Sequence, residues 1–349
     1  MLLVAQLLND CLQDAQGGSL GAVPVSAEGS GYEEARRAFV AAGLAVLGED
    51  GPGADWVQVS LESGPAVGQD LYHGLAETAR ELLATGAARN FFFMHKPPGM
   101  RVRFQAPVRE ARDALRADLT ARFADGAFSA ALSGPPVCGV YEPETYLFGG
   151  AQAMPWVHGL FTADSLAWLD HHAGTAKGPA GAALAAAQWR VSLALLRELF
   201  DGLGIVGWEH RGVWEHVRDD AGRRLWGDAD AGAVDMRRAA EGIRAFWRRD
   251  GREMTAGWEG PQRAALDSHR TAVGVAARRW RTGYFESGDA KCTGPRRAAA
   301  YCVIFHWNRG RLSLARQSLL AEALASPEMS RAPAGREEAA VAAGVSRDG

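Results

Sequence analysis

The chain has 349 residues, with 38 Lys+Arg against 41 Asp+Glu, 47% hydrophobic residues and 23% charged residues. This length and balance allow one large or two ordinary domains with hydrophobic cores, and they exclude an intrinsically disordered chain, a collagen-like repeat and a small disulfide-stabilised protein. The four cysteines form no CxxC pair, which excludes a zinc knuckle and a disulfide framework and indicates a reducing, cytoplasmic location.

Residues 1–53 are predicted to form a helical N-terminal extension, in which two short helical segments flank a Gly- and Ser-containing stretch. The opening segment, MLLVAQLLNDCL, has no basic residues before its apolar run, and that run is too short to span a bilayer. We therefore expect a cytoplasmic protein with no membrane partner.

Residues 54–150 alternate between strand and helix patterns. Strands are predicted over 56–60, 89–94, 100–105 and 136–142, and helices over 70–85 and from Pro107 to Gly126. The order βαββαβ predicts a ferredoxin-like antiparallel sheet with both helices on one face.

Beyond Gly150 the pattern becomes almost entirely helical. Helices are predicted over 163–172, 181–201, 232–249, 260–282 and 296–324. Strands followed by helices favour an α+β fold over a parallel nucleotide-binding sheet. Residues 325–349, rich in Ala, Glu, Arg, Ser and Pro, are predicted to be a disordered tail.

Two arginines alternate with apolar residues on one predicted strand, and a glutamate follows another. Arg101 and Arg103 should point to one face of the sheet, where guanidinium groups can bind a carboxylate or peptide carbonyls. Glu144 lies just beyond the strand at 136–142 and can act as a general base or an arginine partner. A solvated outer face and a structural ion pair remain open as alternatives.

The last predicted helix carries polar groups on an otherwise apolar surface. Helical spacing predicts two neighbouring stripes on this helix. One holds Tyr301, Phe305 and Asn308, and the other holds Cys302, His306 and Arg309. Buried polar groups of this kind need partners, so the stripe lines an active site or belongs to a satisfied structural network. His and Tyr are natural proton donors for such a site.

The sequence contains no motif for a metal or cofactor. The pair His171-His172 diverges on a helix, and the spacing of His210 and His216 does not suit one helical face. The GxGxxG, GxxxxGK[ST] and GxSxG motifs of dinucleotide, nucleotide-triphosphate and esterase sites do not occur in these contexts. We expect no cofactor and no metal.

Positive charge is concentrated in residues 236–297, which hold fourteen Lys+Arg against seven Asp+Glu. Aromatic residues, among them Trp247 and Trp280, alternate with the basic ones, among them Arg279. The pattern is typical of a surface that binds an acidic partner, either a nucleic acid or an acidic peptide. Ordinary solvated helix surfaces can show the same pattern, so all three interpretations remain open.

Several motifs in a fixed order resemble the elimination domain of LanB-type lantibiotic dehydratases, and in particular its stand-alone relatives in thiopeptide biosynthesis. The motifs are Trp56-x-Gln58, FFFMHKPPGMRVRF (91–104), YEPETYLFGG (141–150), LFTADS (160–165) and FHWNR (305–309). The resemblance covers 54–324 and implies an α+β domain that binds a ribosomally made precursor peptide through its leader.

The departures from that family pattern are informative. Met100 stands where the glutamate-eliminating enzymes have His, Leu147 where they have Arg, and Ile304-Phe305 where they have His-Met. A site without these groups should not eliminate glutamate. Thiopeptide pyridine synthases fit the description, and this resemblance implies a formal aza-[4+2] cycloaddition between two dehydroalanines, followed by loss of water and of the leader peptide.

The resemblance also implies roles for the candidate residues. Tyr301 and His306 would move protons, Glu144 would orient the substrate, and Tyr284 and Asp164 are reserve candidates. The remaining candidates would bind substrate or leader: Arg101, Arg103, Asn308, Trp247, Trp280 and Arg279. The partner is then a dehydrated, leader-bearing thiopeptide precursor rather than a nucleic acid, and the sequence specifies no oligomeric state. Two alternatives stay open: a glutamate-eliminating dehydratase component and a non-catalytic subunit that escorts the precursor.

Overall fold

A computed structural model describes most of the chain between residues 53 and 326. The described residues are 53–63, 68–174, 187–225, 233–287 and 293–326, together with positions 8, 31, 32 and 36. The predictions of an N-terminal extension over 1–53 and of a tail over 325–349 therefore fall almost entirely outside the described residues.

The first half of the described chain is built on a four-stranded antiparallel sheet. Its strands are β1 (Trp56–Glu62), β2 (Asn90–Lys96), β3 (Gly99–Gln105) and β4 (Val137–Gly139). The strand order is β2-β3-β1-β4, with α3 (Gln69–Ala84) and α4 (Arg112–Ala124) as the connecting helices. This is the predicted ferredoxin-like arrangement, so the expected α+β fold is confirmed. Strand β4 is shorter than predicted because the chain leaves β1 after Gly139.

The two faces of the sheet differ in character, as the alternation along β3 predicts. Val102 and Phe104 are completely buried and pair with Val59 and Val57 on the face that α3 and α4 cover. Arg103 lies on the opposite face, next to Gln58 of β1 in the strand register. We call this second side, with Gln58, Arg101 and Arg103, the arginine face.

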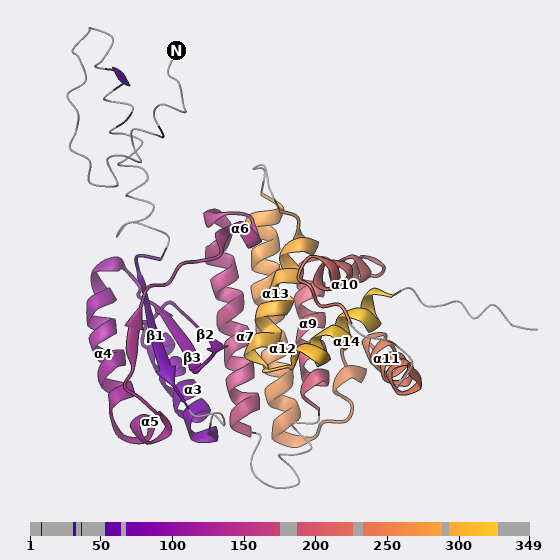
Figure 1. Cartoon of the computed structure of the whole chain (residues 1–349), viewed down its shortest axis with the longest axis horizontal. Coiled ribbons are helices and arrows are strands. Elements are labelled where there is room, and N and C mark those ends of the chain that lie inside the picture. Colours follow the sequence, from indigo (N-terminus) through magenta and orange to yellow (C-terminus); the bar gives the residue numbers. More distant parts are fainter. Residues whose placement is uncertain are drawn as a thin grey trace, which may run out of the picture.

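One edge of the sheet is closed by α7 (Met154–Gly174), which runs along β2 (Figure 1). The Phe91 amide donates to the Thr162 hydroxyl at 3.0 Å, and the Phe93 amide donates to the Ser165 hydroxyl at 3.4 Å. Side chains of α7 thus satisfy backbone groups that an edge strand would otherwise leave unpaired. Two shorter helices, α5 (Gly126–Ala131) and α6 (Thr145–Phe148), flank β4 in the chain.

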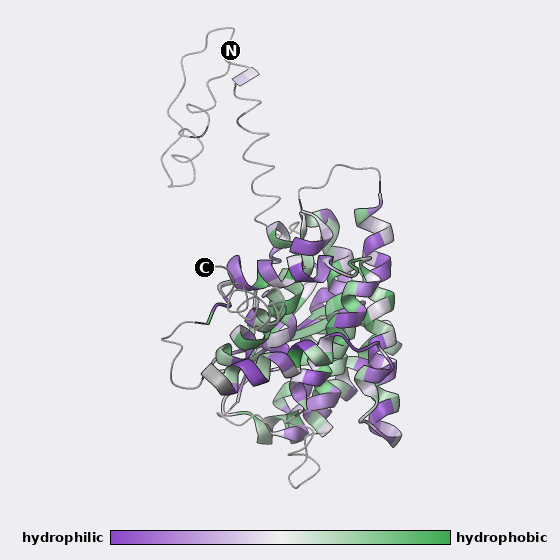
Figure 2. Ribbon diagram, turned by 90° about the vertical axis from the view of Figure 1, so that its right-hand side faces the viewer, coloured by the Kyte–Doolittle hydropathy of each residue, from purple (hydrophilic) through white to green (hydrophobic). Residues whose placement is uncertain are grey.

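The second half is a helical layer that packs on α7. Its helices are α9 (Gln188–Gly202), α10 (Glu209–Asp219), α11 (Ala233–Trp247), α12 (Gly260–Trp280), α13 (Pro295–Arg309) and α14 (Leu314–Ala325). Helix α12 packs against both α7 and α9, and hydrophobic residues concentrate between the helices (Figure 2). No helix in the described part of the chain is long and apolar enough to cross a membrane.

The predicted single helix over 296–324 is wrong, because the chain turns between α13 and α14. Arg311 has a φ of 54°, outside the helical region, and a side chain on Gly310 would come within 2.6 Å of the Trp168 ring. The turn folds α14 back beside α10 and α11.

Candidate functional site

Arg103 is the centre of the arginine face. Its side chain is 9% exposed, its Nε donates to the Gln58 amide oxygen at 2.7 Å, and its guanidinium lies 5.0 Å from the ring centres of Phe92 and Tyr141. Burial lowers the pKa of Arg103, and the nearby Tyr141 and Glu144 partly oppose that shift. Such a fixed, stacked guanidinium can present its remaining N–H groups to a carbonyl or carboxylate.

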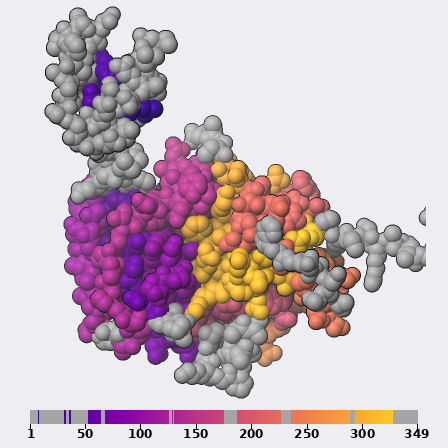
Figure 3. All heavy atoms as spheres, viewed as in Figure 1, coloured from indigo at the N-terminus to yellow at the C-terminus, as the bar shows by residue number. Residues whose placement is uncertain are grey.

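Arg101 and Glu144, both predicted site residues, lie at the rim of this face. Arg101 is half-buried on the same side of β3, and Glu144 is half-buried directly before α6. The segment around them is open to solvent, since Val137, Val140 and Tyr146 are 58%, 80% and 77% exposed. In Figure 3 the indigo and violet segment that contains the sheet reaches the surface beside α13 and α14. The structure therefore places Arg101 and Glu144 close enough to Arg103 to affect its pKa, with Arg103 buried and the exposed residues at the rim of this face.

Tyr141 and His158 belong to the arginine face although the sequence analysis did not select them. Burial lowers the pKa of His158 to about 3, with a further contribution from Arg103, so its ring is neutral near pH 7. Burial raises the pKa of Tyr141, which keeps the phenol protonated, and its hydroxyl shares a hydrogen bond with His158 Nε2 at 2.8 Å. The signal for Tyr141 was its place in the YEPET motif, whereas His158 gave no local signal.

The double glycine after α6 allows a close approach between this turn and Tyr284. Gly149 has a φ of 103°, and its carbonyl accepts a hydrogen bond from the Tyr284 hydroxyl at 2.7 Å. A side chain on Gly149 would come within 2.2 Å of that hydroxyl oxygen. Tyr284, a reserve candidate in the sequence analysis, is 4% exposed and anchors the turn that positions α6.

His306 and Asp164 lie in a buried network that joins α7 to α13. His306 Nδ1 donates to Asp164 Oδ1 at 2.6 Å, and Arg309 Nη1 donates to Asp164 Oδ2 at 2.7 Å. The three residues are only 3%, 5% and 1% exposed. Burial alone would raise the pKa of Asp164, but the hydrogen bonds and charges of His306 and Arg309 outweigh it and hold that pKa below its usual range.

The second imidazole nitrogen of His306 is also occupied. His306 Nε2 lies 2.9 Å from the Ser192 hydroxyl of α9, which in turn accepts from the Trp307 indole at 3.1 Å. His306 is thus satisfied within the chain, as the structural-network alternative predicts. Arg309 is satisfied only in part, because its buried Nη2 has no hydrogen-bond partner among the described residues. Direct proton transfer from His306 to a bound peptide has no path through its present contacts.

The buried network nevertheless touches the arginine face through one aromatic ring. The Arg309 guanidinium lies 4.2 Å from the Phe161 ring centre and 5.8 Å from that of Phe92, the ring that Arg103 also contacts. Arg309 Nε also donates to the Phe93 carbonyl of β2 at 3.2 Å. The position of the arginine face therefore depends on the Asp164–Arg309 pair.

The other stripe of α13 faces α6. Phe305 stacks on Phe161 with ring centres 5.1 Å apart, and the Tyr301 ring lies 6.5 Å from Phe148 of α6. Tyr301 and Asn308 are both half-buried. Tyr301 thus lies beside α6, and its role as a proton donor stays a prediction.

The predicted aromatic anchors for a leader peptide need correction. Trp247 is 8% exposed and packs on Phe200, His210 and Trp214, and Trp280 is completely buried. Both rings fill the core of the helical layer, because their helices place them on the face that packs against other helices. Arg279 is exposed on α12.

Two of the histidines considered for a metal, His172 and His210, bond to backbone carbonyls. His210 Nε2 donates to the Ile205 carbonyl at 2.9 Å, and the rings of His171 and His172 are inclined by 65°. Within the described residues, no three His, Cys, Asp or Glu side chains come close enough to share a metal ion.

Comparison with known proteins identifies the family. The model for the C-terminal region of lantibiotic biosynthesis dehydratases matches residues 56–326. The fold is similar to the tRNA-dependent lantibiotic dehydratase MibB from Microbispora sp. 107891, with 18% identity, a TM-score of 0.52 and coverage of 79% of this chain and 28% of MibB. The structure of TsrL is similar with 14% identity, a TM-score of 0.41 and coverage of 77% and 92%. No curated protein matches. Because the family match spans most of its length, the chain belongs to the lantibiotic biosynthesis dehydratase C-terminal family.

Proposed function

We propose that this chain is a pyridine synthase, which joins two dehydroalanines of one precursor peptide in a formal aza-[4+2] cycloaddition. The observation that carries the proposal is the composition of the region between α6 and α13. The arginine face on β3 and the residue before α6 keep the arginines and the glutamate of the family pattern. Between α6 and α13, however, Leu147 and Ile304 are half-buried aliphatic side chains packed against the core. An apolar wall of this kind offers no charged group to a departing glutamate.

Met100, the third departure from the family pattern, lies away from the arginine face. Its side chain is 1% exposed and alternates with Arg101, so it lies on the face of the sheet covered by α3 and α4. Its difference from the family's His therefore concerns packing, and Leu147 and Ile304 are the departures that bear on chemistry.

The proposed reaction needs no change of oxidation state. An amide N–H proton moves to the amide oxygen, which gives an iminol and hence a 2-azadiene. Two carbon–carbon bonds then form to the second dehydroalanine and close a six-membered ring. Loss of water from the former amide carbon and loss of the leader as a carboxamide leave the aromatic pyridine and the macrocycle.

Proximity should supply most of the acceleration. Holding the two alkenes in contact can contribute as much as about 7–11 kcal/mol, whereas positioned proton donors typically contribute about 10²–10⁴-fold. In this scheme Arg101 and Arg103 hold peptide carbonyls and Glu144 orients the chain. Tyr301 is the proton donor, and His306 is a positioning residue that acts through Asp164 and Arg309.

The test is incubation of a dehydrated, azole-bearing, leader-carrying precursor with this protein alone, followed by mass spectrometry. Loss of water together with release of the leader carboxamide supports the proposal. Removal of glutamate from a glutamylated precursor would instead make the chain an eliminase, and a bound but unchanged peptide would make it an escort subunit; either result overturns the synthase.

Tyr301→Phe tests the assignment of the proton donor. We expect its turnover rate to fall by about 10²-fold, the lower end of general acid catalysis, with peptide affinity unchanged. The matched control is Tyr146→Phe, since Tyr146 is 77% exposed on α6 and should lose nothing. Equal rates for the two variants would remove Tyr301 from the mechanism.

A further inference from the structure

A groove on the helical half, away from the arginine face, has a volume of about 610 Å³ and lies between α9, α11 and α14. Its floor is apolar: Ile243, Phe246 and Leu320 are 6%, 5% and 1% exposed. Along α11 the groove is lined by exposed small residues, Ala239, Gly242 and Ala245 among them. A side chain on Gly242 would meet nothing within 4 Å, so this wall leaves room for another segment.

Three arginines surround this apolar floor. Arg190 lies over the Trp189 ring at 5.2 Å, Arg249 lies over the Phe246 ring at 5.6 Å, and Arg316 is exposed on α14. Among the residues that the structure describes, none of these three guanidinium groups pairs with a carboxylate, and no Asp or Glu lines the groove. The groove therefore combines an apolar floor with a positive rim that nothing in the described structure neutralises.

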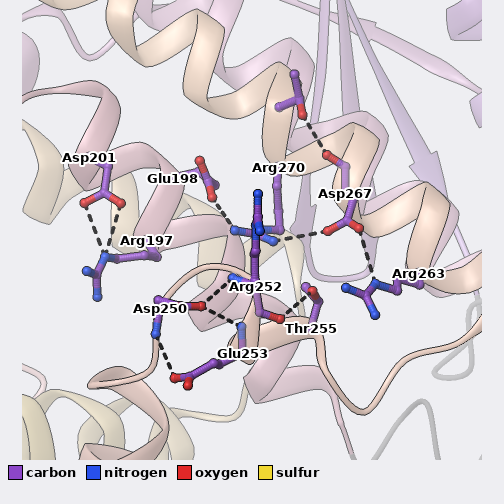
Figure 4. Close-up of polar contacts among 11 residues, drawn as sticks. Arg197, Glu198, Asp201, Asp250, Arg252, Glu253, Thr255, Arg263, Asp267 and Arg270 are labelled. Carbon is purple, nitrogen blue, oxygen red and sulfur yellow. Dashed lines mark hydrogen bonds and ion pairs between the residues drawn. The ribbon is translucent and has the colours of Figure 1, made fainter.

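A neighbouring cavity of about 480 Å³ shows the contrast (Figure 4). There Arg270 pairs with Glu198 and with Asp267, and Asp267 also pairs with Arg263. The arginines of that cavity are thus largely satisfied within the chain, whereas those of the groove are not.

We propose that the groove binds an acidic, amphipathic helical segment of a peptide partner. The apolar side of such a helix fits the floor, its close approach is permitted by the small residues of α11, and its carboxylates meet the three arginines. If the proposed function is correct, this segment is the leader of the precursor; only that identification rests on the proposed function.

The chain's own terminal residues are a less suitable occupant on charge grounds. Residues 327–349 contain four acidic and three basic side chains, so they carry little net charge for a rim of three arginines. The test below separates this occupant from an external peptide.

The probe is a fluorescein-labelled 18-residue peptide of leucines at helical spacing with glutamates on the other positions, measured by fluorescence anisotropy with the full chain. Its controls are the same peptide with lysine in place of glutamate and a scrambled glutamate peptide. We expect binding of the first peptide alone, weakened as the salt concentration rises from 50 to 300 mM because rim charges are screened at roughly 8–10 Å.

Two variants locate the site. Gly242→Leu fills the groove from an exposed helix position and should abolish binding, and Arg249→Glu should weaken it by roughly three- to tenfold, as for an exposed charge pair that is reversed. Arg279→Glu is the matched control, because Arg279 is an exposed arginine on α12 outside the groove. Circular dichroism melts check that all three variants fold.

Equal losses for Arg249→Glu and Arg279→Glu would overturn the proposal, because binding would then follow overall charge. Equal affinity for the glutamate and lysine peptides would overturn it as well. A full chain with Glu337→Lys and Glu338→Lys should bind as the parent does, and tighter binding would mean that the chain's own end occupies the groove. These measurements involve no turnover, so their failure leaves the cycloaddition untouched, and absence of cycloaddition leaves them valid.

Discussion

Asp164 is the residue on which the buried polar network depends. One carboxylate accepts hydrogen bonds from both His306 and Arg309, and the guanidinium of Arg309 reaches from there to the backbone of β2. A buried ion pair contributes little net stability compared with apolar packing, but removing one partner leaves the other charge without compensation. The main role of Asp164 is therefore to hold Arg309 in position, and the ion pair itself adds little to the net stability of the fold.

Asp164→Asn should lower the free energy of unfolding by about 3–5 kcal/mol, the cost typical of breaking a buried pair. Urea denaturation followed by circular dichroism measures it. Asp118→Asn breaks an exposed pair with Arg122 on α4 and should cost less than about 1 kcal/mol. Similar losses in the two variants would show that the Asp164 network is not as isolated from solvent as its 5% exposure indicates.

At the residue scale, the sequence predicted which side chains of α13 share a face better than it predicted what they contact. Helical spacing correctly grouped Cys302, His306 and Arg309 on one buried stripe. The partners of that stripe lie 142 residues away at Asp164 and 114 residues away at Ser192, and no local pattern encodes such pairings. Trp247 and Trp280 were placed on the surface because their neighbours are arginines, but a helix alternates buried and exposed faces within a single turn.

At the scale of elements, α6 is held by a turn that permits almost no substitution. Gly149 combines a positive φ with a carbonyl bonded to Tyr284, so the five-residue segment after α12 fixes the position of a four-residue helix. Since α6 contacts α13, the turn sets the spacing of the region in which we place the reaction.

Gly149→Ala should destabilise the protein more than backbone strain alone explains. Gly86→Ala gives that strain by itself, because Gly86 has a φ of 74° and nothing within 4 Å of the added carbon; we expect roughly 1–2 kcal/mol there. Gly149→Ala should cost clearly more, and part of the excess should disappear in a Tyr284→Phe background. A double-mutant cycle by urea denaturation checks the coupling, and additive effects would exclude the contact as its cause.

The elements most accurately predicted are those with strong periodicity. The buried side of β3, with Val102 and Phe104, and the spacing of Leu115, Leu119 and Phe123 on α4 follow the sequence pattern. Burial along β1 does not alternate, because residues 56–59 are all buried. Helix α10 was missed because its segment is mostly polar, and the turn at Arg311 was missed because its neighbour Gly310 alone marks it. Tertiary packing against Trp168, which sequence periodicity does not report, determines that turn.

At the scale of the whole molecule, buried neutral histidines make stability depend on pH. Burial lowers the pKa of His95, His158 and His171 to about 3 and that of His172 to about 4. In the unfolded chain a histidine has a pKa near 6.5. Below that pH the unfolded state binds protons that the folded state does not, so stability is complete above about pH 6.5 and is lost as the pH falls toward 4.

We expect each buried histidine to lower the free energy of unfolding by as much as about 1.4 kcal/mol per pH unit within this window. Urea denaturation at pH 7.5, 6.5, 5.5 and 4.5 gives the slope of the free energy of unfolding against pH. His171→Gln should flatten it, whereas His73→Gln should not, because the His73 side chain is 68% exposed. A slope unchanged by His171→Gln would mean that His171 is protonated in the folded protein.

The hydrogen bonds of Arg309 join distant parts of the chain. Asp164 precedes it by 145 residues and Phe93 by 216 residues. During synthesis the strands of the sheet and α7 leave the ribosome long before Arg309 does. Until α13 follows, the Asp164 carboxylate lacks both of its partners, and burying it unpaired would be costly. We therefore expect the contact between α7 and the sheet to reach its full stability only after α13 has been synthesised.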